Sequence, residues 1–172
     1  MPSTQMTRIS LLLALAIAPS CTAWNIVTAP IDAIVREETT PGPIARAADQ
    51  ACLQEAIYFE SGNSDLTGRV AVGHVILNRV ADDRFPSTIC GVIAEGQSEG
   101  RCQFSYRCDL DVTDIRWPGQ HATAGETATA ILSDSTEDPT DGALFFHSAS
   151  IAPGWFATRE RRGNFGGNIF YR

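Results

Sequence analysis

The sequence contains no lysine, and its 13 basic residues, all arginines, stand against 20 acidic residues, which gives a formal net charge of −7. A protein that binds nucleic acid by neutralising phosphates needs an excess or a strong patch of cations. The composition therefore argues against a nucleic acid partner.

The sequence also lacks a long hydrophobic run. The longest apolar stretch near the N-terminus, Ile9–Ala18, is too short to span a bilayer comfortably, and it follows a segment with one charge, Arg8. Small residues then precede Trp24, as at a signal-peptide cleavage site. We predict a signal peptide over residues 1–23, export, and no stable membrane insertion after processing. Cys21 leaves processing as a lipoprotein as an alternative.

Either route of processing removes Cys21, which leaves an even number of cysteines in a compartment where disulfides persist. Four thiols predict two disulfides, and sequence alone allows three pairings. We expect a periplasmic or cell-envelope protein and a monomer. The four cysteines are Cys52, Cys90, Cys102 and Cys108.

Residues 24–46 are rich in proline and favour a flexible linker, so residues 47–172 should form one domain. Stretches that contain little glycine or proline, together with helical spacing of apolar residues, predict a mainly α (α+β) fold with little β structure. The expected elements are helices over 47–61, 67–80, 87–94 and 120–133, a short strand or buried segment over 142–148, and glycine-rich coil after that.

Glu60 is the first candidate for chemistry. Leu53, Ala56, Ile57 and Glu60 are spaced so that they share one helical face. A carboxyl on an apolar face loses water, which raises its pKa and lets it act as a general acid, as glycoside cleavage requires. The alternative is a glutamate at a helix end that turns to solvent or pairs with an arginine such as Arg79.

A conventional glycosidase also needs a second carboxylate at a defined separation from the first. The spacing singles out none of the available acids, and each is equally explained as a solvated loop charge. The acids considered are Asp65, Glu95, Glu99, Asp109 and Asp111.

Histidines and cysteines suggest two other kinds of site, a metal site and a cysteine nucleophile. His74, His121 and His147 lack the spacing of metal ligands, so neither a metal nor another cofactor is expected. Cys52 near a helix N-terminus could be the nucleophile of a wall peptidase, but an even number of thiols favours disulfides.

Several segments, in order along the chain, resemble the SleB/CwlJ-type cell-wall hydrolase family. They are Glu55-Ala-Ile-Tyr-Phe-Glu60-Ser-Gly, Gly68-Arg-Val-Ala-Val, Val75-Ile-Leu-Asn-Arg-Val80, Arg84-Phe-Pro-Ser-Thr-Ile-Cys-Gly-Val92, Arg101-Cys-Gln-Phe-Ser105, Phe146-His147 with Pro153 and Trp155, and Gly166-Gly-Asn-Ile-Phe-Tyr171. The resemblance covers nearly the whole domain from Ala51 onward.

The resemblance implies a lysozyme-like single domain whose substrate is peptidoglycan. It implies cleavage between N-acetylmuramic acid and N-acetylglucosamine, as a lytic transglycosylase or muramidase, with Glu60 as the catalytic residue. A transglycosylase uses the 6-hydroxyl of its substrate as nucleophile, which accounts for the lack of a second carboxylate. The family segment along the sugar groove falls on Gln103, Phe104 and Ser105, which are expected to bind substrate unless Phe104 is core and Gln103 only holds a loop.

The chain departs from the family pattern at two positions: Ser64 replaces a glutamate and Asn168 stands where histidine is common. If either missing group assists catalysis, activity would be reduced or lost. A non-catalytic peptidoglycan-binding protein and a wall amidase or peptidase therefore remain alternatives.

Overall fold

A computed structural model describes residues 43–172 except residue 152. The predicted signal peptide and most of the predicted linker lie outside these residues. Within them, no helix is both long enough and apolar enough to cross a membrane. Helix α1 begins at Pro43, four residues before the helix predicted from residue 47, and a proline suits the first helical turn.

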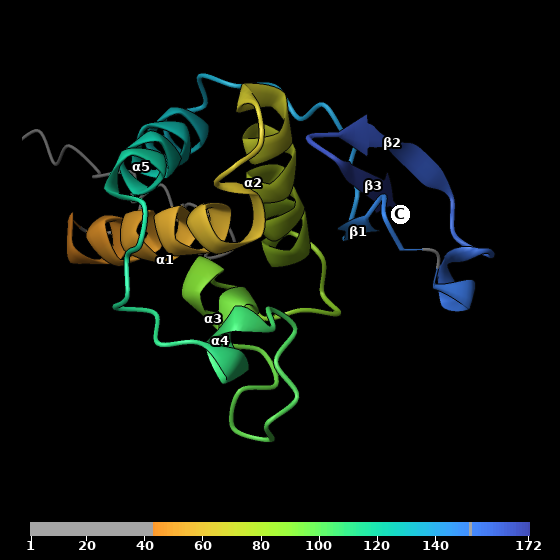
Figure 1. The fold of residues 1–172 in the computed structure, drawn as a ribbon, viewed down its shortest axis with the longest axis horizontal. Coiled ribbons are helices and arrows are strands. Elements are labelled where there is room, and N and C mark those ends of the chain that lie inside the picture. The colour runs from red at the N-terminus through yellow and green to blue at the C-terminus, as the bar shows by residue number, and fades with distance from the viewer. Residues whose placement is uncertain (1–42, 152) are drawn as a thin grey trace, which may run out of the picture. The chain divides into compact units, whose positions relative to one another are not determined.

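Five helices and a small sheet make up the described domain (Figure 1). Helix α1 packs against α5, α2 and α3. The helices are α1 (Pro43–Ser61), α2 (Leu66–Val80), α3 (Ile89–Ile93), α4 (Tyr106–Asp109) and α5 (Pro118–Leu132), with a 3-10 turn η2 at Gly154–Phe156. This agrees with the predicted fold class, although α4 was not predicted.

The core forms where α1 meets its neighbours. Leu53, Ala56 and Ile57 of α1 have no exposed surface, which confirms the predicted apolar stripe. The buried residues of helix α2 lie around most of its circumference, as predicted for a central helix. Asp65 begins α2, because its side chain accepts a hydrogen bond from the backbone N–H of Gly68 at 2.8 Å.

The C-terminal segment is a sheet, and its prediction as coil was wrong. Strands β1 (Phe145–Ser148), β2 (Arg161–Phe165) and β3 (Asn168–Tyr171) are antiparallel in the order β1-β3-β2. The β2–β3 turn is Gly166-Gly167, both with positive φ (56° and 82°), as a tight two-residue hairpin requires. A Gly-Gly pair between apolar runs is a hairpin signal that could have corrected the prediction.

The hairpin turn lies directly against the start of α2. A Cβ atom on Gly68 would come within 2.6 Å of the Cα of Gly166, so both positions need glycine for this close approach. The hydroxyl of Ser64 also donates a hydrogen bond to the carbonyl of Gly166 at 3.0 Å. The sheet is thereby fixed to the turn that follows α1.

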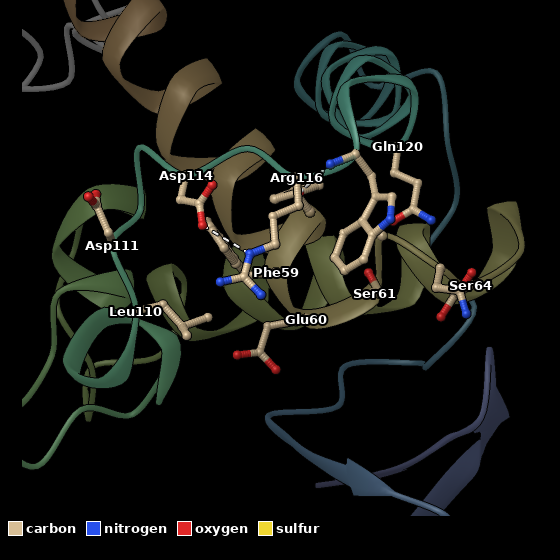
Figure 2. A pocket seen from close by; sticks show the side chains of 13 residues that line it. Phe59, Glu60, Ser61, Ser64, Leu110, Asp111, Asp114, Arg116 and Gln120 are labelled. Carbon is tan, nitrogen blue, oxygen red and sulfur yellow. Dashed lines mark hydrogen bonds and ion pairs between the residues drawn. The ribbon is translucent and has the colours of Figure 1, made fainter.

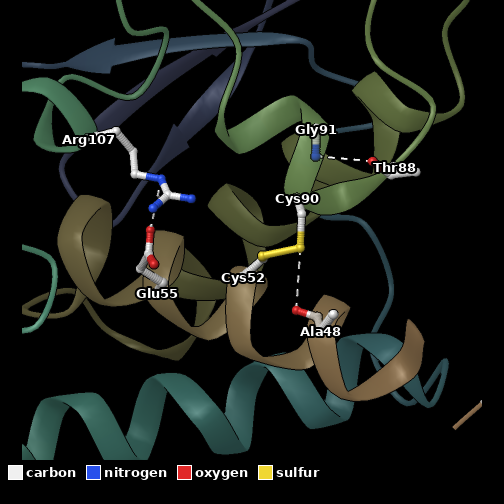
Figure 3. Close-up of a disulfide and its surroundings, with 7 residues drawn as sticks. All are labelled: Ala48, Cys52, Glu55, Thr88, Cys90, Gly91 and Arg107. Atoms are coloured by element: carbon white, nitrogen blue, oxygen red, sulfur yellow. Dashed lines mark hydrogen bonds and ion pairs between the residues drawn. A yellow bond between two sulfur atoms is a disulfide. The ribbon is translucent and has the colours of Figure 1, made fainter. Parts of the chain in front are cut away.

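The structure selects one of the three possible cysteine pairings. Cys52 of α1 is bonded to Cys90 of α3 (Figure 3), and Cys102 is bonded to Cys108 across a short loop that ends in α4. The same loop is tied to α1 by an ion pair, 3.2 Å between Nε of Arg107 and Oε1 of Glu55. Segments without much secondary structure are therefore anchored to α1.

The two disulfides should contribute unequally to stability. Cys52–Cys90 closes a loop with a sequence separation of 38 and Cys102–Cys108 one of 6. Loop entropy predicts a loss of about 4 kcal/mol for the first and about 2 kcal/mol for the second when each pair is changed to alanine. Urea unfolding of the two double variants measures both losses, and a larger loss for the short loop would contradict this account.

Candidate active site

Glu60 lies one residue before the end of α1. The apolar stripe of this helix ends there, and the side chain of Glu60 borders a groove. It is the only residue shared by the two cavities described here, of about 330 Å³ and about 300 Å³. Both volumes lie at the lower end of the range for small-molecule sites, roughly 300–1,000 Å³. A chain-like ligand that filled both cavities would pass over the carboxyl of Glu60.

The first cavity lies between the end of α1, the segment after α4 and the start of α5. Figure 2 shows Leu110 and Arg116 bordering it beside Glu60. Its other lining residues are Tyr58, Phe59, Ser61, Gly62, Asn63, Ser64, Asp111, Asp114, Trp117 and Gln120.

The second cavity holds the three residues predicted to bind substrate. Gln103, Phe104 and Ser105 line it together with Glu60 and Arg79; Phe145 and Phe146 complete it. Gln103 and Ser105 are exposed and can offer an amide and a hydroxyl to a ligand. Phe104 is only 2% exposed and belongs to the hydrophobic core, so it contributes at most a floor to this cavity.

Arg79 is a buried cation at the end of α2. The sequence suggested it only as an ion-pair partner for Glu60. It is 5% exposed, and its Nε donates a hydrogen bond to the carbonyl of Leu144 at 2.8 Å. Its guanidinium lies 5.2–5.8 Å from the ring centroids of Phe85, Phe104 and Phe145, which is within cation–π range.

Two opposed effects set the proton affinity of Glu60. Burial disfavours the charged carboxylate and raises its pKa from 4.5 to about 7, while the charge of Arg79 works in the opposite direction. The lost hydration dominates because the net shift is upward. Near neutral pH, Glu60 is therefore divided between its acid form and its carboxylate form, as a group that both gives and takes a proton requires.

Three other carboxyls of the domain, Asp111, Asp114 and Asp65, have local structural partners. Asp111 accepts hydrogen bonds from the N–H and hydroxyl of Thr113, which lower its pKa, and it points away from Glu60 in Figure 2. Asp114 pairs with Arg116 at 2.9 Å. Asp65 caps α2. Glu95 lines neither cavity, although its charge acts on Arg79.

The histidines and cysteines do not assemble an alternative site. His74, His121 and His147 have separate neighbours, Thr136, Gln54 and Tyr171 respectively. Within the described part of the chain, no group of three metal-ligating side chains was found. Cys52 is disulfide-bonded and so lacks the thiolate that a cysteine peptidase needs.

The two departures from the family pattern lie in different surroundings. Ser64 lines the first cavity and holds the hairpin through its hydrogen bond to Gly166. Asn168 pairs with Ser148 and Phe165 in the sheet and lines neither cavity. Only the exchange at position 64 therefore changes the groove itself.

Comparison with known proteins supports one family. The family model described as cell wall hydrolase matches residues 63–171, a range that starts three residues after Glu60. The spore cortex-lytic enzyme of Bacillus cereus is 33% identical over 125 residues, 71% of this chain and 43% of that enzyme. The corresponding enzyme of Bacillus subtilis is 28% identical over 125 residues, 71% of this chain and 37% of that enzyme. The chain thus spans less than half the length of these relatives.

Two solved structures have the same fold. One is the catalytic domain of the germination-specific lytic transglycosylase SleB from Bacillus anthracis, with a TM-score of 0.57 and 30% identity over 72% of this chain and 93% of that domain. The other is the catalytic domain of the Bacillus cereus SleB protein, with a TM-score of 0.56 and 30% identity over 73% of this chain and 91% of that domain. The predicted resemblance and the predicted fold class are confirmed.

The raised pKa of Glu60 has a consequence for stability that does not depend on function. A carboxyl with a higher pKa in the folded chain binds more protons when folded, so stability falls as the pH rises from about 4.5 to about 7. Glu60→Gln should remove this loss and be at least about 1 kcal/mol more stable than the parent at pH 8, with little difference at pH 4.

Urea unfolding at the two pH values tests this expectation, and Glu126→Gln, at an exposed carboxyl on α5, serves as the control. A difference between Glu60→Gln and the parent that is the same at both pH values would show that folding does not raise the pKa of Glu60.

Proposed function

The chain belongs to the cell wall hydrolase family, and from this premise we propose that it cleaves the glycan strands of peptidoglycan between N-acetylmuramic acid and N-acetylglucosamine, with Glu60 as the catalytic acid and base. The observation that carries the proposal is the position of Glu60. A partly buried carboxyl with a pKa near 7 lies where two cavities meet, so the sugars on either side of a glycosidic bond can occupy one cavity each.

In this mechanism the protonated carboxyl of Glu60 first donates its proton to the glycosidic oxygen as the bond breaks. The carboxylate that results is stabilised by the charge of Arg79, which already favours the ionised form. It then accepts the proton of the 6-hydroxyl of the muramic acid as that oxygen attacks the anomeric carbon. Glu60 thereby returns to its acid form and an anhydro ring closes.

The surroundings of Glu60 favour transglycosylation over a two-carboxylate hydrolysis. Of the acids considered in the sequence, only Asp111 lines a cavity with Glu60, and its Oδ1 accepts two hydrogen bonds from Thr113. Asp114, which also lines that cavity, is paired with Arg116. A substrate hydroxyl is therefore the nucleophile that this groove best accommodates. One of the two solved structures with this fold is the catalytic domain of a lytic transglycosylase, which supports this assignment.

We also propose that the protein acts outside the cytoplasm, in the cell envelope. Its substrate lies there, and its two disulfides form and persist in oxidising compartments. Gln103 and Ser105 are proposed to bind the sugar in the second cavity, where their polar side chains are exposed.

Product analysis tests the proposed reaction. Purified protein incubated with peptidoglycan sacculi should release anhydro-muropeptides, identified by mass spectrometry, and Glu60→Gln should lower the rate at least about 100-fold because the general acid is lost. New reducing ends without anhydro products would indicate hydrolysis instead. Released peptides would indicate an amidase or peptidase, and binding without products would indicate a wall-binding protein in which Ser64 replaces a required glutamate.

The pH dependence of turnover follows from the same carboxyl. Because the first step needs protonated Glu60, we expect the cleavage rate at saturating sacculi to fall about tenfold for each pH unit above about 7. The rates of muropeptide release from pH 5 to pH 9 measure this limb. A rate that stays constant to pH 9 would show that Glu60 is not the acid.

A further inference from the structure

We infer that Trp117 is a stacking platform for one N-acetylated sugar ring, the ring that occupies the first cavity beside Glu60. The inference rests on the proposed function, because it names how that same groove holds its glycan. The side chain of Trp117 is 59% exposed. Its indole therefore leaves a large apolar surface in contact with water.

Trp117 is not the only exposed apolar side chain at the first cavity. Five large hydrophobic side chains of the described residues are exposed, and two of them, Trp117 and Leu110, line the first cavity. Figure 2 shows Leu110 on the opposite side of this cavity from Gln120 of α5. Apolar surface gathered in a hollow marks a binding site more often than isolated exposed residues do.

Of the three aromatic residues that line this cavity, Trp117 is the one with a large accessible surface. Tyr58 is only 6% exposed. Phe59 stacks on Tyr106, with centroids 4.6 Å apart and planes 14° apart, so one of its faces is already covered. An indole with free surface can cover the C–H face of a pyranose ring, which gains apolar burial without requiring any charge.

Trp117 is also held in a fixed relation to Glu60. Its backbone N–H donates a hydrogen bond to the hydroxyl of Tyr58 at 3.2 Å, and Tyr58 lies two residues before Glu60 on α1. Its carbonyl accepts the N–H of His121 in the first turn of α5. These bonds fix the backbone from which the indole projects relative to the helix that carries the acid, which reduces the freedom lost on binding a ligand.

Apart from the exposed carboxylate of Asp111, the remaining lining residues suit an uncharged sugar. Asn63, Ser64 and Gln120 can bond to hydroxyl and N-acetyl groups at the edge of a ring whose face rests on the indole. The charges of Asp114 and Arg116 are paired with each other at 2.9 Å. The first cavity thus offers an apolar surface for the C–H face of an N-acetylated sugar and polar groups for the substituents at the edge of its ring.

The experiment measures binding in the Glu60→Gln protein, so that no substrate is consumed. The probe is peptide-free glycan of alternating N-acetylglucosamine and N-acetylmuramic acid, titrated by calorimetry. Adding Trp117→Ala should weaken binding about tenfold, whereas Trp117→Phe should keep it within about threefold. Leu132→Ala, at an exposed residue at the other end of α5 that lines neither cavity, should leave it unchanged.

The possible results separate the two proposals. If the Glu60→Gln protein binds the glycan and Trp117→Ala binds it equally well, the stacking role is wrong while the proposed function stands. If Trp117→Ala weakens binding to intact sacculi but not to peptide-free glycan, Trp117 contacts the peptide stem and the inference is overturned. If the Glu60→Gln protein binds neither glycan nor sacculi, both proposals fail. Circular dichroism of each variant confirms that it is folded.

Discussion

The burial of one face of α1 is the constraint on which the site depends. Leu53, Ala56 and Ile57 must leave water for the domain to have a core, and the next position of that stripe is a carboxyl. Packing α1 against α2 and α5 therefore carries Glu60 partly out of water, which raises its pKa without any dedicated device. The same contacts that stabilise the fold produce a group able to exchange protons near neutral pH.

The groove around Glu60 is built mostly from segments with little regular structure, and this explains the cross-links. Helices α3 and α4 are short, and the segments around them contribute walls to both cavities. Cys52–Cys90 fixes α3 to α1, while Cys102–Cys108 and the Arg107–Glu55 ion pair fix the loop that bears Gln103 and Ser105. The residues proposed to bind a sugar are thus held by covalent and ionic contacts where helical packing is scarce.

Sequence reasoning predicted what depends on local pattern. The stripe on α1 and the central helix α2 follow from helical periodicity, and Glu60 lies where that stripe places it. The cysteine pairing could not be predicted, because it depends on α1 meeting α3 in space. Trp117 was not singled out for the same reason: the hydrogen bond that fixes it joins residues 59 positions apart. The β2–β3 hairpin was missed although Gly166-Gly167 signalled it, since both strands are short and β2 contains a glycine at its centre.

The choice of arginine over lysine has a physical consequence at position 79. A lysine buried to this degree among three phenylalanine rings would tend to lose its proton, and the charge that opposes the desolvation of Glu60 would be lost with it. Burial also lowers the pKa of Arg79, but from the very high value of an arginine, so its guanidinium stays charged near neutral pH. Its planar guanidinium can bond to the carbonyl of Leu144 while its faces meet aromatic rings, which a lysine ammonium cannot do. The proton balance of Glu60 therefore depends on a cation that does not itself titrate.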